Sequence, residues 1–267
     1  MKVGTGKGPR LEVLFTPADF GTLPLRDLSG STCAVFDVLR ATTTLLTALG
    51  AGAESVRPVS SIEEALRERA SDPAVLLAGE RDGIRITAER SGGVAFDLGN
   101  SPREFTAQRV FGRRIVATTT NGTRALRACV GAAHVLPACL RNVGSVADWM
   151  VAQPTGQWIV VCSGTYEDAA YEDVVGAGAL VDRLTRRLPE VELLDSAVVA
   201  RSIYREASSD LVAALSTHAR NGRRLAAHPE LAPDVAICAT EDDLPMVARM
   251  DAGGVIRVMA PGGSGVG

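Results

Sequence analysis

The sequence predicts an α/β fold in which helices cover a layered, mixed and largely parallel sheet. Two observations predict it: short runs rich in β-branched residues recur along the chain, and amphipathic helical patterns lie between them. The predicted strands, in chain order, are Leu11–Phe15, Thr32–Phe36, Ala74–Ala78, Arg114–Ala117, His134–Leu136, Trp158–Val161, Val235–Ile237 and Val255–Met259.

Two of the helices between these strands are predicted in detail. Two overlapping capping boxes precede a helix over Ile62–Ala70. A second helix, over Glu172–Leu188, places apolar residues at steps of three and four, which predicts one buried face. Its Gly176-Ala177-Gly178 segment is similar to part of a dinucleotide-binding motif, but acids precede it instead of a strand. We therefore interpret these small residues as packing the helix against the sheet.

The 267 residues are predicted to form one domain, 11–260, between flexible tails at 1–10 and 261–267. Gln153–Gly156 is the strongest internal break, so the sequence leaves open whether the domain consists of two lobes that meet near residue 154. A chain of this length, with 46% hydrophobic residues, can bury a sufficient core without a disulfide or a structural metal.

Charge and composition exclude several classes of function. The net charge of −3 argues against a nucleic-acid partner, and no run approaches the ~20 apolar residues of a membrane span. Five cysteines without close pairing and the lack of an apolar signal core predict a reduced, cytoplasmic protein. No histidines stand at metal-ligand spacing, and no GxxxxGK[ST] phosphate loop is present. Whether the chain forms a homodimer stays open.

Three predicted strands end in hydroxyls, amides and glycine. The segments that follow them are Asp37–Thr44, Thr118–Thr123 and Cys162–Thr165. Ligands of open α/β sheets bind outside the carboxyl ends of the strands, where helix N-termini offer N–H groups to anions. One such loop is most simply a helix cap, whereas three in one chain, one of them with Arg40, favour an oxyanion site, above all for phosphate. We expect the three loops to meet at one edge of the sheet.

Five acids stand beside these loops. Asp37 directly follows its strand, where a carboxylate can hold Mg²⁺ or attack phosphorus, and the sequence leaves both roles open. Glu80, Asp97, Glu172 and Asp173 follow other strands or begin helices, and each alone would also suit a cap or a surface salt bridge. Mg²⁺ takes only one or two protein carboxylates and keeps several waters, so not all five are ligands.

Eight segments together resemble the 2-phosphosulfolactate phosphatases of the ComB type. They are FDVLRATTT (36–44), AGER (78–81), FDLGNSP (96–102), TTTNGTRA (118–125), RNVGSVA (141–147), CSGT (162–165), EDxxGAGAL (172–180) and NGRRL (221–225). They cover most of the chain in the order of the family. The resemblance implies a distinctive ComB-like α/β fold rather than a Rossmann or haloacid-dehalogenase fold. One departure is Tyr171 before the second acidic pair, which together with Tyr166 alters one edge of the expected pocket.

The resemblance also implies a Mg²⁺-dependent phosphatase that converts 2-phosphosulfolactate to 3-sulfolactate and phosphate, in the branch to coenzyme M. We then expect Asp37 and Arg40 to be the catalytic residues, and one or more of Asp37, Glu80 and Asp173 to hold the metal. The residues expected to bind the phosphate or the rest of the substrate are Thr42, Thr43, Thr44, Arg81, Asn100, Ser101, Thr120, Asn121, Thr123 and Ser163. The alternatives are a phosphatase for another phosphorylated hydroxy acid and a non-catalytic binder of phosphorylated metabolites.

Overall fold

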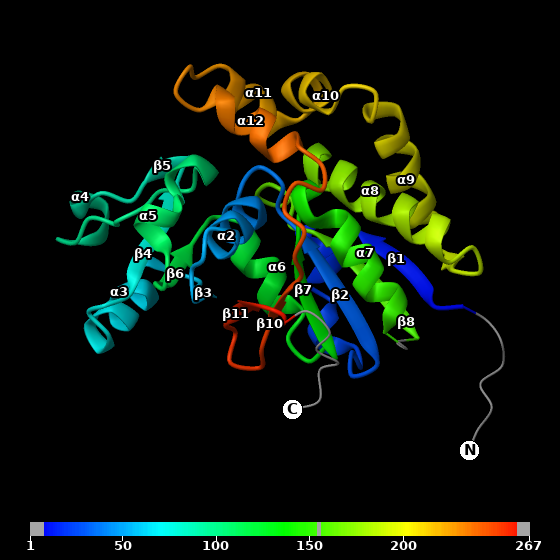
Figure 1. The fold of residues 1–267 in the computed structure, drawn as a ribbon, viewed down its shortest axis with the longest axis horizontal. Coiled ribbons are helices and arrows are strands. Elements are labelled where there is room, and N and C mark those ends of the chain that lie inside the picture. Colours follow the sequence, from blue (N-terminus) through cyan, green and yellow to red (C-terminus); the bar gives the residue numbers. More distant parts are fainter. Residues whose placement is uncertain (1–7, 154–155, 261–267) are drawn as a thin grey trace.

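The computed structural model describes residues 8–153 and 156–260 (Figure 1). The predicted tails fall largely outside this part of the chain, as do residues 154–155 of the predicted break. The strands are β1 (Arg10–Leu14), β2 (Ser31–Phe36), β3 (Ser55–Pro58), β4 (Leu76–Arg81), β5 (Ile84–Arg85), β6 (Arg114–Thr118), β7 (His134–Ala138), β8 (Gln157–Cys162), β9 (Glu192–Leu193), β10 (Ala248–Met250) and β11 (Ile256–Val258).

Helices connect and cover these strands. The α-helices are α1 (Pro17–Phe20), α2 (Ala41–Gly50), α3 (Ile62–Ser71), α4 (Ala88–Ser91), α5 (Ala107–Val110), α6 (Gly122–Ala128), α7 (Val143–Ala152), α8 (Tyr171–Arg187), α9 (Asp195–Ala207), α10 (Leu211–His218), α11 (Arg220–Ala226) and α12 (Ala232–Ala239). Short 3₁₀ turns lie at η1 (Leu23–Leu25), η2 (Pro102–Glu104) and η3 (Leu140–Asn142). No helix in the described ranges has both the length and the apolar character needed to cross a bilayer.

The strands form one sheet in the order β5-β4-β6-β3-β11-β10-β7-β2-β8-β1-β9. Two parallel blocks make up most of it, β9-β1-β8-β2-β7 and β3-β6-β4. The antiparallel hairpin β10–β11 joins them, through the pairs Met250 with Val135 and Ile256 with Val56. Three antiparallel steps separate β7 from β3, so the two blocks run in opposite directions. The prediction of a mixed, largely parallel sheet covered by helices is confirmed.

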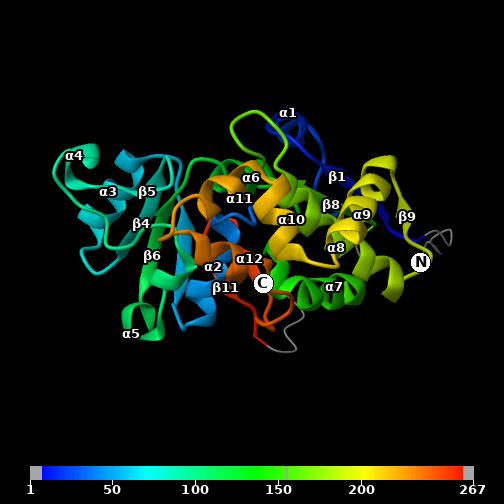
Figure 2. The ribbon, with the colours of Figure 1, turned by 90° about the horizontal axis from the view of Figure 1, so that it is seen from above.

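The central strand β2 shows why the sheet is covered on both faces. All six of its residues are buried, as is usual for parallel strands with helices on either side. Ala34 and Phe36 face one hydrophobic cluster, with residues of α7, α8 and α9, whereas Cys33 and Val35 face the other, with α2 and α6. Figure 2 shows α3, α4 and β5 at one end of the molecule and α9 and β9 at the other.

Both detailed helix predictions are confirmed. Ser61 caps α3 by accepting a hydrogen bond from the main-chain N–H of Glu64, and α8 begins and ends within a residue of the prediction. One predicted strand is wrong, because Val235–Ile237 lies inside α12. A short β-branched run does not distinguish a strand from a buried helical segment, and Pro233 in the first turn favours the helix. β3 was not predicted, since it is only four residues long and ends in a proline.

The small residues of α8 pack closely, as predicted. A β-carbon on Gly176 would lie 2.7 Å from Phe36 Cδ1 and 2.9 Å from Val38 Cγ2, next to β2. A β-carbon on Gly178 would collide with the main-chain oxygen of Ala200 on α9. α8 therefore approaches both the sheet and α9 at distances that only glycine permits.

We expect Gly178→Ala to lower the free energy of unfolding by about 1–3 kcal/mol, because the added methyl group forces α8 and α9 apart. Chemical denaturation measures this difference. Gly30→Ala is the matched control, since a β-carbon there meets nothing within 4 Å, and its effect should stay within about 0.5 kcal/mol. Equal stability of the two variants would contradict the close packing of α8 against α9.

Candidate functional site

A pocket of about 710 Å³ opens among the loops that follow strands of both parallel blocks. Residues at or after the carboxyl ends of β2, β4, β6 and β8 line it, together with residues near η2, α11 and the start of α12. The expected meeting of the three polar loops is therefore found, but the expected reason was incomplete. β6 belongs to the block that runs opposite to β2 and β8, so the strand ends face one another across the pocket instead of sharing one parallel edge.

Asp37 begins the loop after β2. Its Oδ1 accepts a hydrogen bond from the main-chain N–H of Ala41 at 2.9 Å and so caps α2. Its Oδ2 has no hydrogen-bond donor among the described residues. A β-carbon on Gly122, the first residue of α6, would lie only 2.8 Å from this oxygen. The glycine thus lets the loop after β6 approach the carboxylate.

The threonine hydroxyls of α2 bind the main chain and do not line the pocket. Thr42 Oγ1 lies 2.8 Å from the Ala138 oxygen and 2.9 Å from both the main-chain oxygen and nitrogen of Asp37. Thr43 donates to the Val38 oxygen, and Thr44 donates to the Asn100 oxygen. In this arrangement the hydroxyls fix the loop after β2, whereas the sequence analysis expected them to face a phosphate.

Two further carboxylates tie the loops together. Glu80 Oε1 accepts from the main-chain N–H and the hydroxyl of Thr120, at 3.1 and 3.0 Å, and its Oε2 accepts from the N–H of Gly83. Asp173 Oδ1 accepts from the N–H of Val38 at 2.8 Å, and its Oδ2 from the N–H of Gly164 at 3.1 Å. Glu80 therefore joins β4 to the loop after β6, and Asp173 joins α8 to the loops after β2 and β8.

Burial raises the pKa values of Asp37, Glu172 and Asp173. Burial, with the charges of Glu172 and Glu80 adding to it, raises the pKa of Asp37 to about 7. The pKa of Asp173 lies well above its usual range, through burial and through the charges of Asp37 and Glu172. Burial also raises the pKa of Glu172, whose Oε1 accepts from Asn221 while its Oε2 is buried without a hydrogen-bond partner. The cluster favours either bound protons or a cation.

These donors fit a magnesium ion held by one or two carboxylates. Asp37 and Glu80 both line the pocket, and oxygen donors of this kind, completed by water and phosphate, suit Mg²⁺. Asp173 does not line the pocket, and both of its oxygens already accept main-chain hydrogen bonds. Within residues 8–153 and 156–260, no group of three or more His, Cys, Asp or Glu is arranged to hold a metal. Asp97 lies elsewhere, bound to Arg69 and to the N–H of Leu77.

The remaining predicted residues divide between the pocket and its supports. Those that line the pocket are Arg40, Asn100, Ser101, Thr120 and Asn121. Arg81 instead binds Thr118, and the hydroxyl of Thr123 binds the Thr119 oxygen. Ser163 is buried, its hydroxyl has no partner, and it is not part of the lining. Of the two tyrosines singled out, Tyr166 lines the pocket, whereas Tyr171 packs against His218.

Sequence reasoning missed Asp234, a fully buried carboxylate on α12. It forms an ion pair with Arg40 at 2.7 Å and another with Arg103 at 2.8 Å. It directly precedes the segment Val235–Ile237 that was assigned to a strand, and no local pattern marks a carboxylate that pairs with residues far away in the chain. It also missed Arg85 and Arg224, which line the pocket with Arg40.

Replacing Thr42 by the isosteric valine should lower the free energy of unfolding by about 1–3 kcal/mol, because the N–H of Asp37 loses its hydrogen-bond acceptor in the core. Chemical denaturation measures the loss. Thr217→Val, at an exposed position of α10, serves as control and should change stability by less than about 0.5 kcal/mol. If Thr42→Val keeps wild-type stability but binds phosphate more weakly, the hydroxyl binds phosphate, as the sequence analysis expected, and does not support the loop.

Comparisons with known proteins place the chain in a family. The family model for 2-phosphosulpholactate phosphatase matches residues 21–253. A probable 2-phosphosulfolactate phosphatase of Symbiobacterium thermophilum is 37% identical over 87% of this chain and 97% of its own length. One from Synechococcus sp. (strain JA-3-3Ab) is 39% identical over 85% of this chain and 91% of its own length. The chain therefore belongs to the 2-phosphosulfolactate phosphatase family, a family of phosphoric monoester hydrolases.

Proposed function

We propose that this chain is a Mg²⁺-dependent phosphatase that hydrolyses 2-phosphosulfolactate to 3-sulfolactate and phosphate, the reaction of the branch to coenzyme M. The observation that carries the proposal is the pocket in which Asp37, Glu80 and Arg40 lie together. Two carboxylates beside a guanidinium suit a magnesium ion and a phosphate dianion side by side. The names of the relatives supply the substrate.

Three arginines match the three anionic groups of this substrate. Phosphosulfolactate carries a phosphate, a sulfonate and a carboxylate, and the arginines that line the pocket are Arg40, Arg85 and Arg224. Guanidinium groups bind each of these oxyanions through paired N–H donors. We assign the phosphate to Arg40, because it follows β2 next to Asp37, and the other two groups to Arg85 and Arg224.

The residues of this chain bind and orient the phosphoester in this proposal. Arg40, Ser101, Thr120 and Asn121 line the pocket and offer donors to the phosphate oxygens. Asp37 Oδ2, which has no donor among the described residues, acts as the nucleophile or as a metal ligand. When bound, Mg²⁺ supplies charge neutralisation for the phosphate oxygens and for the carboxylates beside them.

The purified protein should release phosphate from 2-phosphosulfolactate in the presence of Mg²⁺ and lose this activity in EDTA. A divalent ion is required because Arg40 is already paired with Asp234 and cannot neutralise both a phosphate and the carboxylate cluster. A phosphate-release assay with and without chelator tests this, and 2-phospholactate, which lacks the sulfonate, tests the substrate. Full activity in EDTA would refute the metal requirement, and phosphate binding without turnover would favour a non-catalytic binder.

Asp37→Asn keeps the shape of the side chain and removes its charge, so kcat should fall by at least about 10²-fold while the fold persists. Steady-state kinetics measure kcat, and circular dichroism checks the fold. Asp148→Asn, at an exposed ion pair with Arg187, is the control and should retain wild-type kcat. A near-native kcat for Asp37→Asn would restrict Asp37 to capping α2.

A further inference from the structure

A buried carboxylate outside every recognised motif holds Arg40, one of the three arginines that line the pocket. Asp234, in the first turn of α12, is fully buried. Its Oδ2 accepts from Arg40 Nη1 at 2.7 Å, and its Oδ1 accepts from Ser101 Oγ and Arg103 Nε, each at 2.8 Å. Asp234 is not part of the pocket lining, whereas Arg40 and Ser101 are. The carboxylate thus stands directly behind the pocket wall.

These contacts leave Arg40 a fixed orientation with donors to spare. The Arg40 side chain is only 4% exposed, and its second contact runs from Nη2 to the Gly83 oxygen at 3.2 Å. A guanidinium carries five N–H groups, so these two contacts leave three without a partner among the described residues. Because Arg40 lines the pocket, they are the donors that a ligand there would use. Asp234 in turn is held from two sides, because Ser101 and Arg103 both donate to the oxygen that does not bind Arg40.

Without Asp234, Arg40 would have a competing set of partners nearby. Its charge already acts on Asp37, which lines the same pocket as Glu80. A guanidinium released from its counter-charge would turn toward these carboxylates and occupy the space of a phosphate. The cost of desolvating two charges largely offsets the attraction within a buried ion pair, so such pairs add little to stability. We therefore expect the main effect of the Arg40–Asp234 pair to be the orientation of Arg40.

We propose that Asp234 is a positioning residue, which keeps the Arg40 guanidinium directed at the phosphoester and away from the pocket carboxylates. This inference rests on the proposed function for the role of Arg40. It also makes α12 part of the binding site, although none of the eight segments that resemble the family lies in α12.

A double-mutant cycle tests whether Asp234 acts through Arg40. The variants are Asp234→Asn, Arg40→Lys and the double variant, each assayed with Mg²⁺ for the Kd of inorganic phosphate by calorimetry and for kcat and KM of phosphate release. We expect Asp234→Asn to weaken phosphate binding by about tenfold and to raise KM similarly. The double variant should bind phosphate no more weakly than Arg40→Lys, because the second change removes the support of a group that is already altered.

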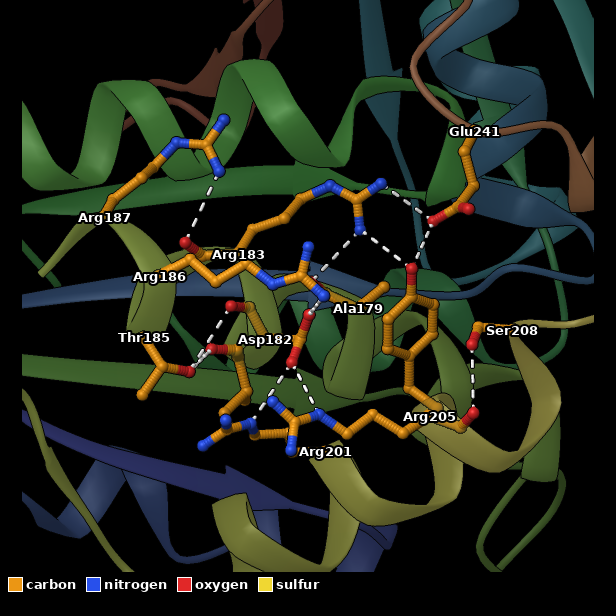
Figure 3. A network of polar contacts seen from close by, with 12 residues as sticks. Ala179, Asp182, Arg183, Thr185, Arg186, Arg187, Arg201, Arg205, Ser208 and Glu241 are labelled. Atoms are coloured by element: carbon orange, nitrogen blue, oxygen red, sulfur yellow. Dashed lines mark hydrogen bonds and ion pairs between the residues drawn. The ribbon is translucent and has the colours of Figure 1, made fainter. Parts of the chain in front are cut away.

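Asp182 provides a matched control. This carboxylate of α8 is equally buried and pairs with Arg186, Arg201 and Arg205 (Figure 3). None of these four residues lines the pocket. Asp182→Asn should lose stability in chemical denaturation, as Asp234→Asn does, and yet keep wild-type phosphate affinity. A merely structural role for Asp234 predicts that the two variants behave alike.

The outcomes separate this inference from the proposed function. Wild-type phosphate affinity in Asp234→Asn, or effects that multiply in the double variant, overturns the positioning role. If Asp234→Asn fails to fold, Arg103→Gln replaces it, because the half-exposed Arg103 side chain supports the same carboxylate. We then expect phosphate binding to weaken by about threefold, and this effect to be absent in the Arg40→Lys background. Phosphate binding that follows this pattern without turnover overturns only the phosphatase, whereas a wild-type protein that binds no phosphate overturns both.

Discussion

Hydrogen bonds from main-chain N–H groups to buried carboxylates organise the centre of this molecule. Asp37 binds the start of α2, Glu80 binds the loop after β6, and Asp173 binds the loops after β2 and β8. The Asp37 bond closes the turn from β2 into α2, whereas the bonds of Glu80 and Asp173 join segments that follow or lie on different elements within one block of the sheet. The hairpin β10–β11 connects the blocks through only one residue pair on each side. Contacts between the loops add to it, because Arg40 after β2 donates to the Gly83 oxygen after β4, and Asn121 after β6 accepts from the main-chain N–H of Tyr166 after β8.

The carboxylates at the centre of the molecule also bring several acidic groups together in a buried region. Burial raises the pKa values of Asp37, Glu172 and Asp173, and the charges of neighbouring carboxylates add to the shifts of Asp37 and Asp173. Glu172 Oε2 has no hydrogen-bond partner among the described residues. A protein that needed only to join its loops would gain more from neutral hydrogen-bond acceptors, since burying an uncompensated charge is costly. Charge that is unfavourable in the fold and open to a pocket is typical of a functional site.

The sequence predicted those parts of the fold that local pattern determines. β2 and β8 are buried on both faces and read as continuous apolar runs, and α3 is marked by its cap. The pocket was predicted because polar loops follow three strand ends. The direction of the second block was not predictable, since it depends on the pairing of β10 and β11, which are three residues long and far from β3 and β7 in the chain.

Side-chain direction within the loops was also beyond the sequence. Serine and threonine hydroxyls bind either ligands or nearby main-chain carbonyls, and the residue type is the same in both cases. In α2 the hydroxyls of Thr42, Thr43 and Thr44 bind main-chain oxygens. Arg40 is then the side chain of that loop with donors for a ligand. An arginine so close to several carboxylates is useful for binding an anion only if another charge holds it in place. In the proposed site that charge comes from Asp234, 194 residues further along the chain, so the loop motifs alone do not complete it. In this proposal α11 and α12, which lie above α2 in Figure 1, belong to the binding site as well as covering the sheet.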